Sequence, residues 1–548
     1  MSVREADAPQ AVAAPAQTPQ VVMDHRARLI VYGSVLLAIF LAAIDQTVVA
    51  TALPRIVTDL QGADRFVWVV TAYLLASTVT IPMYGKFSDV YGRKTMLLSA
   101  IALFLVGSWL SGLSQSMDQL IAFRALQGLG AGGIFPVAIA TVGDLFDARE
   151  RGRYQGAIGA VGGLSFLIGP FVGGWFTEHA SWHWIFYVNI PIGIVALIAV
   201  ARLLPNRRLV SARARDLDYL GIALFTAGFV PLLIGFTNKG EIDLTTGQPY
   251  NWADVRVAAP MILGLLLLGL FLFVEPRAKH AIIPLDLFKN PDYALSMAVT
   301  FLVGLGAFVG VILMPRFFQT VRGIDATTSG YFIFPLLFGM MLSSIGIGIL
   351  ISRTGRYKWL IAGSTVLLVV GAFLMMQLST STPDWQIWLF LLPIGLGIGP
   401  SIAGFTIVVQ SLVPSERMGV ASGTLTVLRQ IGTVVGLAVA GTVFSSAYED
   451  RLPVSLGAEG VPHDLVARLA QVSGALQGVG NAQLLLHHIV PPALAYLIPK
   501  VIAGTDDAFS HATGTAFEVT LIGAIVAFAL TLLLHDKELK GGRGAVRT

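Results

Sequence analysis

Cysteine and charge are both scarce in this sequence. None of the 548 residues is cysteine, which excludes disulfide bonds, thiolate metal sites and thiol catalysis. Charged residues make up 12% of the chain and hydrophobic residues 55%, whereas an average soluble protein carries roughly 25% charged residues. A soluble globule of this length cannot cover its surface with so few charges. The composition excludes an ordinary soluble enzyme and a disordered protein, and it indicates a chain embedded in lipid.

Sequence signals for catalysis and for nucleic-acid binding are also missing. No glycine-rich phosphate loop follows a predicted strand, and GLGAGG lies inside an apolar segment, so ATP hydrolysis and dinucleotide binding are not indicated. His487 and His488 are adjacent and do not share a helix face, which leaves a zinc pair unsupported. The net charge of +4 is spread between apolar blocks and does not favour nucleic acid. We expect no cofactor, no metal and no enzymatic reaction.

Long apolar segments dominate the sequence. A helix needs roughly 20 apolar residues to span the hydrocarbon core of a membrane. Fourteen segments meet this requirement, and the sequence therefore predicts an all-α, polytopic membrane protein. They lie near residues 29–51, 67–87, 95–114, 118–141, 154–177, 182–204, 219–238, 257–275, 293–314, 329–351, 359–379, 385–410, 419–446 and 515–535.

The distribution of lysine and arginine predicts the orientation, because these residues accumulate in cytoplasmic loops. If both termini are cytoplasmic, the inner segments hold 25 Lys and Arg residues and the outer loops hold 9. Arg124 and Arg429 lie within predicted helices. The bias favours an even number of spans, with a disordered cytoplasmic tail at 1–28 and a second cytoplasmic tail at 536–548.

The longest predicted loop, 447–514, joins the last two segments on the outer face. It contains LLLHHIVPPALAYLIPKVIAG, an apolar stretch with two adjacent histidines and three prolines, which makes a poor spanning helix. We predict a re-entrant or interfacial segment that could receive a lipid or bind a periplasmic or lipid-carrier partner. The alternative is an additional span, which would place the C-terminus outside.

An internal repeat relates two distant loops. GKFSDVYGRK follows the second segment, and GILISRTGRYK follows the tenth, with the same spacing and on the same predicted side. Two related helical halves are typical of a transporter whose site lies between them. The matching positions are Gly85 with Gly348, Asp89 with Ser352, Gly92 with Gly355, and Arg93 with Arg356.

The loop GKFSDVYGRK is the strongest candidate for a functional motif. Its glycines permit a tight turn and a close helix approach. Its aspartate can bind helix N-terminal amides, and its basic residues can reach a carboxylate at the end of the fourth segment. The alternative is a basic loop that only sets the topology. The residues of this predicted cytoplasmic gate are Gly85, Asp89, Gly92, Arg93, Lys94 and Asp144.

Asp45 and Arg124 are the predicted proton-coupling pair. Asp45 is the only carboxylate well inside the first six apolar segments, and Arg124 is the matching buried cation. An ionisable group inside a membrane is costly and is a candidate for function. Two structural alternatives stay open: a static pair that positions two helices, and an aspartate that caps the outer end of the first helix.

Small residues in LIGPFVGGWF predict a tightly packed fifth helix. Gly169 and Gly173 are four apart and share one face, with Gly174 beside them, and Pro170 removes a backbone hydrogen bond and bends the helix. Plain packing and a role in transport are both compatible with this pattern.

Polar and aromatic residues within the segments are candidates for a substrate cavity, although each is individually more typical of helix packing. Arg429 has no obvious acid within its span, and the later segments lack a central aspartate. We therefore favour neutral, lipophilic or anionic substrates. The candidates are Gln46, Thr47, Trp68, Tyr73, Gln127, Asn189, Phe332, Phe405, Thr406, Gln410, Arg429 and Gln430.

Several of these blocks together resemble the major facilitator superfamily. GKFSDVYGRK is similar to its signature loop, LIAFRALQGLGAGG to its arginine motif, and LIGPFVGGWF to its antiporter Gly-Pro motif. LAAIDQTVVATALPRI resembles the first-helix signature of its drug:proton antiporters, and WHWIFYVNIPIG resembles the fourteen-helix drug:proton antiporter family in particular. The resemblance implies that Arg124 assists proton coupling and that the bend at Pro170 closes the cytoplasmic side and distinguishes exporters from importers.

The resemblance also implies two six-helix bundles, at 29–204 and 293–535, with two inserted helices in a linker at 205–292. We expect a secondary active transporter of a prokaryotic inner membrane that exports drugs or other amphiphilic small molecules in exchange for protons, by alternating access. Its partners are then membrane lipid, substrate and protons. The rival interpretations are an exporter of a lipid or endogenous amphiphilic metabolite, a membrane-embedded enzyme, and a receptor or scaffold.

Overall fold

The computed structural model describes residues 24–60, 66–205, 218–239, 250–278, 281–471, 473–476, 490 and 492–536. Regular secondary structure within these ranges is entirely helical. The predicted tails at 1–28 and 536–548 lie outside the described residues except for residues 24–28 and 536. The predicted boundary of the first tail at residue 28 is wrong, because α1 already begins at His25. Helical hydrogen bonding extends N-terminal to the apolar segment.

Fourteen helical stretches of the described chain are long and apolar enough to cross a membrane, and each overlaps one of the fourteen segments found in the sequence. The first half contains α1 (His25–Leu60), α2 (Phe66–Tyr91), α3 (Arg93–Gly112), α4 (Met117–Leu145), α5 (Ala148–His179), and a sixth span broken into α6 (Trp184–Tyr187) and α7 (Asn189–Leu203). Two further helices, α8 (Tyr219–Lys239) and α9 (Val255–Val274), follow.

The second half repeats this plan with two interrupted spans at its start. Its helices are α10 (Pro291–Ala307), α11 (Val309–Val321), α12 (Ala326–Tyr331), α13 (Phe334–Thr354), α14 (Lys358–Met375), α15 (Asp384–Leu412), α16 (Met418–Ala458), α17 (His463–Gln471), α18 (Ser473–Leu476) and α20 (Ile498–Leu532).

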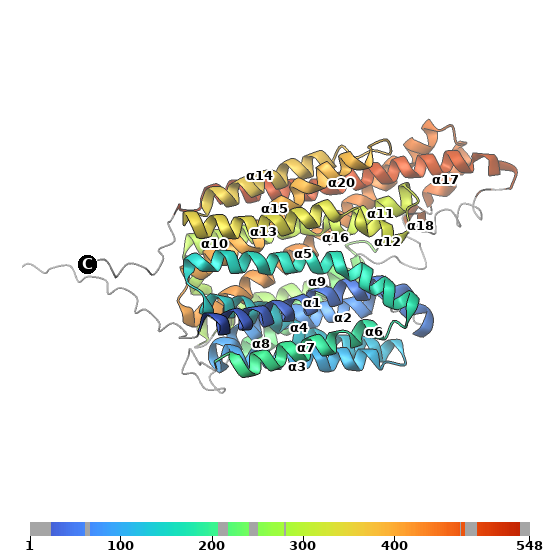
Figure 1. Cartoon of the computed structure of the whole chain (residues 1–548). Helices are drawn as coiled ribbons and strands as arrows, with labels where there is room; N and C mark the ends of the chain where they lie inside the picture. The colour runs from blue at the N-terminus through green and yellow to red at the C-terminus, as the bar shows by residue number, and fades with distance from the viewer. Residues whose placement is uncertain are drawn as a thin grey trace, which may run out of the picture.

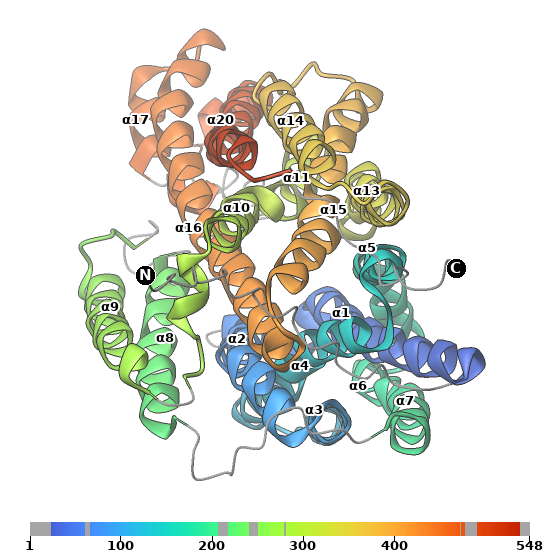
Figure 2. The ribbon, with the colours of Figure 1, turned by 90° about the vertical axis from the view of Figure 1, so that its left-hand side faces the viewer.

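The helices form two bundles with an inserted pair beside them, which confirms the predicted fold. Helices α1–α7 pack together, helices α10–α20 form the second bundle, and α8 and α9 pack on each other next to α2 and α16 (Figures 1 and 2). The bundles meet along α2 with α16 and along α5 with α13. This arrangement leaves a central interface between the two halves.

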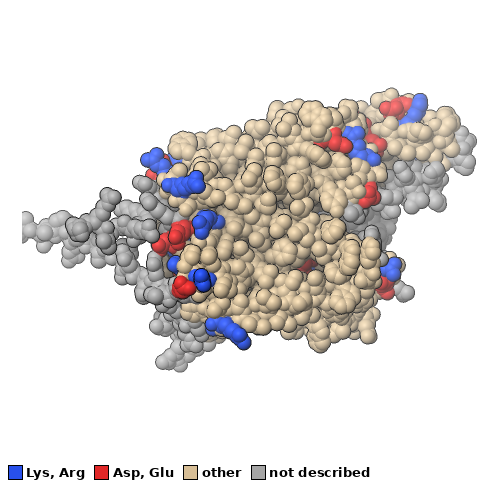
Figure 3. Space-filling model, in the orientation of Figure 1, with Lys and Arg blue, Asp and Glu red and all other residues tan. Residues whose placement is uncertain are grey.

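Charged side chains mark the two ends of the molecule. On the face seen in Figure 3, Lys, Arg, Asp and Glu gather toward the ends, and a broad band with almost no charged surface lies between them. Large apolar side chains such as Leu266 (68% exposed) and Phe273 (63% exposed) point outward from α9, as expected of surface in contact with lipid. We refer to the two ends as the Arg93 end and the α17 end.

The predicted outer loop 447–514 is wrong in its bounds. Helix α16 continues to Ala458 and α20 begins at Ile498, so both helices project beyond the band at the α17 end (Figure 1). At 1.5 Å per residue, the 41 residues of α16 extend about 60 Å, roughly twice the hydrocarbon thickness. The re-entrant prediction fails for residues from Ile498 onward, because Pro499 lies in the first turn of α20, where a helix needs no N–H from it. Residues 472, 477–489 and 491 lie outside the described chain.

Candidate functional site

Charged groups join the two bundles at the Arg93 end. The Arg93 guanidinium lies 2.5 Å from the Asp89 carboxylate and donates from Nε to Asp144 Oδ2 at 2.8 Å. Asp89 also accepts hydrogen bonds from the backbone N–H groups of Gly419 (3.1 Å) and Val420 (3.0 Å). These amides belong to the first turn of α16, where the helix dipole favours a negative charge. An acid of the first bundle thus caps a helix of the second.

The backbones of the two bundles touch beside this cluster. A Cβ atom on Gly85 would lie 2.6 Å from the carbonyl oxygen of Gly419, and one on Gly419 would clash with Gly85. The repeat counterpart of Gly85, Gly348 in α13, makes the same kind of contact with Gly152 in α5. Glycine is therefore required at both crossings, and the Arg93 end is closed in this conformation.

The repeated loops also share their backbone geometry. Gly92 has φ 95° and Gly355 has φ 70°, values that favour glycine over residues with a Cβ. Ser352 stands where the first loop has Asp89, so the second loop offers no carboxylate at that position. Lys94 is half-buried and takes no part in the ion pairs of the cluster.

Asp45 and Arg124 form a buried network inside the first bundle. Arg124 Nη1 donates to Asp45 Oδ2 at 2.5 Å, and the two side chains are 1% or less exposed. Asp45 Oδ1 accepts from Gln127 Nε2 at 2.8 Å and from Asn189 Nδ2 at 3.1 Å. Arg124 Nη1 also donates to Gln127 Oε1 at 2.7 Å. Asp45 lies in the interior of α1, so the helix-capping alternative is wrong.

Tyr73 connects this network to the interface between the two bundles. The Arg124 guanidinium lies 4.2 Å from the centre of the Tyr73 ring, and the Tyr73 hydroxyl donates to the carbonyl of Ala42 at 3.2 Å. One acceptor is left over: Asn189 Oδ1 is buried and has no hydrogen-bond partner among the described residues. A buried acceptor without a partner is costly, and it lies on the side chain that binds Asp45.

The small residues of α5 pack against α1. A Cβ on Gly169 would lie 2.5 Å from Thr47 Cβ, and one on Gly173 would lie 2.8 Å from the carbonyl of Val48. Gly174 has no such neighbour within 4 Å. Pro170 lies inside α5, which leaves the carbonyl four residues earlier without its helical donor. The geometry therefore establishes close packing, whereas a role of the bend in transport stays a prediction.

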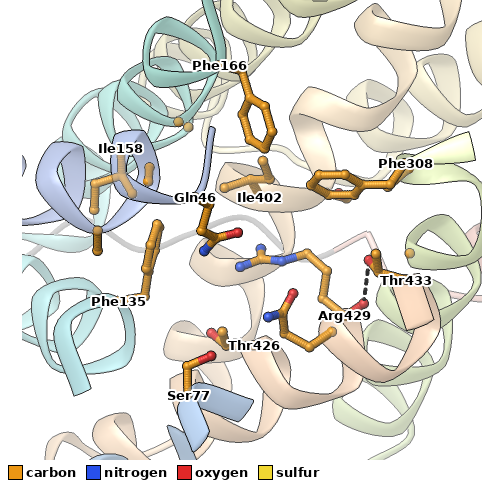
Figure 4. Close-up of a pocket in the computed structure, with 18 of the residues that line it drawn as sticks. Gln46, Ser77, Phe135, Ile158, Phe166, Phe308, Ile402, Thr426, Arg429 and Thr433 are labelled. Atoms are coloured by element: carbon orange, nitrogen blue, oxygen red, sulfur yellow. Dashed lines mark hydrogen bonds between the residues drawn. The ribbon is translucent and has the colours of Figure 1, made fainter. Parts of the chain in front are cut away.

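A cavity of about 160 Å³ lies between the bundles. Helices of both halves line it, and Figure 4 shows Gln46 of α1 and Arg429 of α16 pointing toward each other across it. Its wall is largely apolar, with Phe135, Phe166 and Phe308 among the lining residues. Typical pockets for drug-sized ligands measure about 300–1,000 Å³, so this conformation is a contracted one.

The structure separates the predicted cavity residues into two groups. Gln46, Tyr73, Arg429 and Gln430 line this cavity. The others lie elsewhere. In the first bundle, Thr47 contacts α5, Gln127 and Asn189 bind Asp45, and Trp68 packs in a cluster with α8. In the second bundle, Gln410 donates to the carbonyl of Ile139 and to Ser422, Phe332 packs on Phe318, and Phe405 and Thr406 are buried.

Sequence reasoning missed most of the apolar wall. Ile158, Phe166, Phe308 and Ile402 line the cavity, but a hydrophobic residue on an apolar helix carries no mark that distinguishes a cavity face from a lipid face.

Among the described residues, no group of three or more His, Asp or Glu side chains has an arrangement that could hold a metal ion.

The model of the Major Facilitator Superfamily matches residues 35–437, which is most of the chain. The chain belongs to this superfamily. An uncharacterised transporter of the superfamily from Mycobacterium tuberculosis is 34% identical over 93% of this chain and 70% of its own length. The multidrug transporter protein MdtP of Bacillus subtilis is 33% identical over 93% of this chain and 94% of its own.

A solved transporter structure shares the fold. The human organic anion transporter MFSD10 superposes with a TM-score of 0.58 at 15% identity, covering 92% of this chain and 99% of that one. At this identity the likeness concerns the fold alone. Superfamily membership explains the two related bundles, and it makes the chain a membrane transporter.

Proposed function

We propose that the protein exports amphiphilic small molecules, drugs included, in exchange for protons by alternating access. Similarity to a relative named as a multidrug transporter and the largely apolar cavity between the bundles support the substrate class. The moving bodies are residues 29–204 and 293–535, with 205–292 as the linker. The charge bias and the bacterial relatives support an inner-membrane location with both termini cytoplasmic.

The observation that carries the coupling proposal is the buried Asp45–Arg124 pair. Protonation of Asp45 would leave Arg124 without its counter-charge in a site that excludes water, and breaking a buried pair in this way costs roughly 3–5 kcal/mol. Apolar side chains of similar volume would hold these helices together at a lower free-energy cost than a buried ion pair. Packing of the bundle therefore does not require either charge. Because protonation of Asp45 carries this cost, the pair can shift the equilibrium between two arrangements of the bundle when a proton binds or leaves.

Asn189 supports this role because it can respond to the proton. Its Nδ2 donates to the ionised Asp45, while its Oδ1 has no partner among the described residues. When Oδ1 of Asp45 carries a proton, rotation of the Asn189 amide would place its oxygen opposite that new donor. Protonation would thus supply Asn189 Oδ1 with the hydrogen-bond donor that it lacks while Asp45 is ionised.

The cluster of Asp89, Arg93 and Asp144 is the proposed cytoplasmic gate. Its bonds to the α16 amides exist only while the bundles touch at the Arg93 end. Opening this end would admit substrate from the cytoplasm or the inner leaflet, and reclosure would direct it outward.

Transport by purified protein in proteoliposomes with an imposed pH gradient tests the proposal. We expect wild-type protein to accumulate a fluorescent lipophilic drug against its gradient and Asp45→Asn to lose accumulation while it still exchanges drug without a gradient. Because Asp45→Asn leaves Arg124 unpaired, the variant Asp45→Asn with Arg124→Gln controls for a folding defect. Gradient-driven accumulation by both variants would remove the pair from the mechanism.

Export of an endogenous lipid or amphiphilic metabolite is the second candidate. The observation that favours it is the projection of α16 and α20 beyond the apolar band (Figure 1), a surface on which a lipid or a periplasmic partner could dock. Tight copurification of one lipid, without a drug phenotype on deletion, would favour this candidate over drug export.

A further inference from the structure

The cavity between the bundles contains a cation without a counter-ion. Among the described residues that line it, Arg429 is the one that carries a charge. Its guanidinium extends into the cavity toward Gln46 (Figure 4), and it forms no ion pair with an acidic residue of the described chain. Arg93 and Arg124, by contrast, each bind a buried carboxylate.

An unpaired guanidinium within the membrane is energetically unfavourable. Charged groups inside proteins are normally paired because loss of hydration costs several kcal/mol, and inside a bilayer they mark sites of function. The lining of the cavity is largely apolar, so water in the cavity offsets only part of this cost. A counter-ion supplied by a ligand would complete the site.

The walls around Arg429 have two chemical characters. The amide of Gln46 faces the guanidinium (Figure 4), and Thr426, Gln430 and Thr433 are further polar residues that line the cavity. The remaining wall is formed by aromatic and branched aliphatic side chains, namely Phe135, Ile158, Phe166, Phe308 and Ile402. The cavity therefore presents a polar, positive end and an apolar body.

We propose that this cavity is a binding site for small amphiphiles with one anionic head group, a carboxylate or sulfonate, which Arg429 binds. A guanidinium donates two parallel hydrogen bonds to such a group, and the apolar wall receives the hydrophobic part. The same charge repels a quaternary ammonium ion, and no acid in the lining offsets it. The inference deepens the proposed export function, on which it rests for its biological meaning.

Binding to the purified full-length protein in phosphatidylcholine nanodiscs, measured by isothermal titration calorimetry, tests the site without any transport. The probes share one ring system: naphthalene-2-sulfonate, 2-naphthylmethanol and 2-naphthylmethyl-trimethylammonium. We expect wild-type protein to bind the sulfonate most tightly and the ammonium most weakly. Arg429→Gln should weaken sulfonate binding by about ten- to a hundredfold, as expected for lost charge-assisted hydrogen bonds, and change alcohol binding by less than about twofold.

Two matched variants and one stability measurement separate a ligand site from a structural role. Arg429→Lys should keep the preference for the anion, and Arg256→Gln, which removes an exposed arginine outside the cavity, should bind all three probes like wild type. In ligand-free protein, Arg429→Gln should raise the midpoint of thermal unfolding, because it removes an unpaired charge. A structural role predicts a lowered midpoint instead.

A last experiment distinguishes a lipid head group from a free amphiphile as the anion that binds. Phosphatidylglycerol added to the nanodiscs will displace the sulfonate from wild-type protein if the site takes lipid head groups, and will leave it bound if the site takes free amphiphiles. Sulfonate affinity unchanged in Arg429→Gln, or an ammonium bound as tightly as the sulfonate, overturns the proposal. Failure of the export proposal is distinguishable, since it would abolish gradient-driven accumulation and leave this binding intact.

Discussion

A methyl group added at Gly85 should push the two bundles apart at the Arg93 end. The Cβ of an alanine there would lie 2.6 Å from the carbonyl oxygen of Gly419 and 3.2 Å from its carbonyl carbon, whereas ordinary contacts begin near 3.4 Å. The obstacle is backbone, which cannot move aside as a flexible side chain does. The closed conformation must therefore separate α2 from α16 or tolerate the overlap.

The size of this effect follows from measured costs of overpacking. Such costs are typically about 1–3 kcal/mol, which corresponds to roughly a 5- to 150-fold change in the ratio of closed to open protein. Alanine also gains about 1 kcal/mol of helix propensity over glycine, but this gain applies to both conformations and cancels in their ratio. We expect Gly85→Ala to populate a conformation that is open at the Arg93 end.

The absence of native cysteine makes the assay direct. Thr95→Cys and Arg356→Cys place one exposed label on each bundle at the Arg93 end, and pulsed electron spin resonance of the two spin labels reports their separation. Gly85→Ala should shift the distribution to longer distances. Gly346→Ala is the matched control, because its Cβ meets nothing within 4 Å. Identical distributions for wild type, Gly85→Ala and Gly346→Ala would refute the proposed contact-dependent closure.

Three further outcomes test the packing and the charge networks. Asp89→Asn should speed opening of the Arg93 end without abolishing substrate binding, because it weakens the cap on α16; an unchanged turnover would count against the gate. Gly173→Ala should lower the free energy of unfolding by about 1–3 kcal/mol while its neighbour Gly174→Ala does not, as denaturant titration can show; equal effects would contradict the α1–α5 packing. Asp45→Asn should destabilise the protein by roughly 3–5 kcal/mol, and addition of Arg124→Gln should recover much of that loss; a double variant no more stable than the single one would contradict a buried ion pair.

The fourteen spans could be predicted from the sequence because length and apolarity decide whether a helix crosses a membrane. Their ends could not, because helices such as α16 continue into polar sequence where hydrogen bonding within the helix still satisfies the backbone. The predicted bounds of the loop 447–514 are wrong for this reason, and because Pro499 lies in the first turn of α20, where proline does not interrupt a helix.

The charged residues of the site were easier to predict than its shape. Asp45, Arg124, Asp89, Arg93 and Asp144 stand out because few ionisable groups occur in such segments, and the structure brings them into two networks. The sequence places Gln127 and Asn189 among the cavity candidates, whereas the structure has them bound to Asp45. Polar side chains on apolar helices look alike in sequence, whether they bind a buried acid or face a ligand. Only the packing of the helices tells them apart.

Proton movement driven by substrate tests the central claim most directly. Proteoliposomes containing a trapped pH indicator are given an outward or inward gradient of a transported drug, with no imposed pH gradient. The account predicts that wild-type protein moves protons opposite to the drug and that Asp45→Asn moves drug down its gradient with no accompanying protons. Proton movement of equal size in Asp45→Asn, or none in wild-type protein that transports the drug, would contradict it.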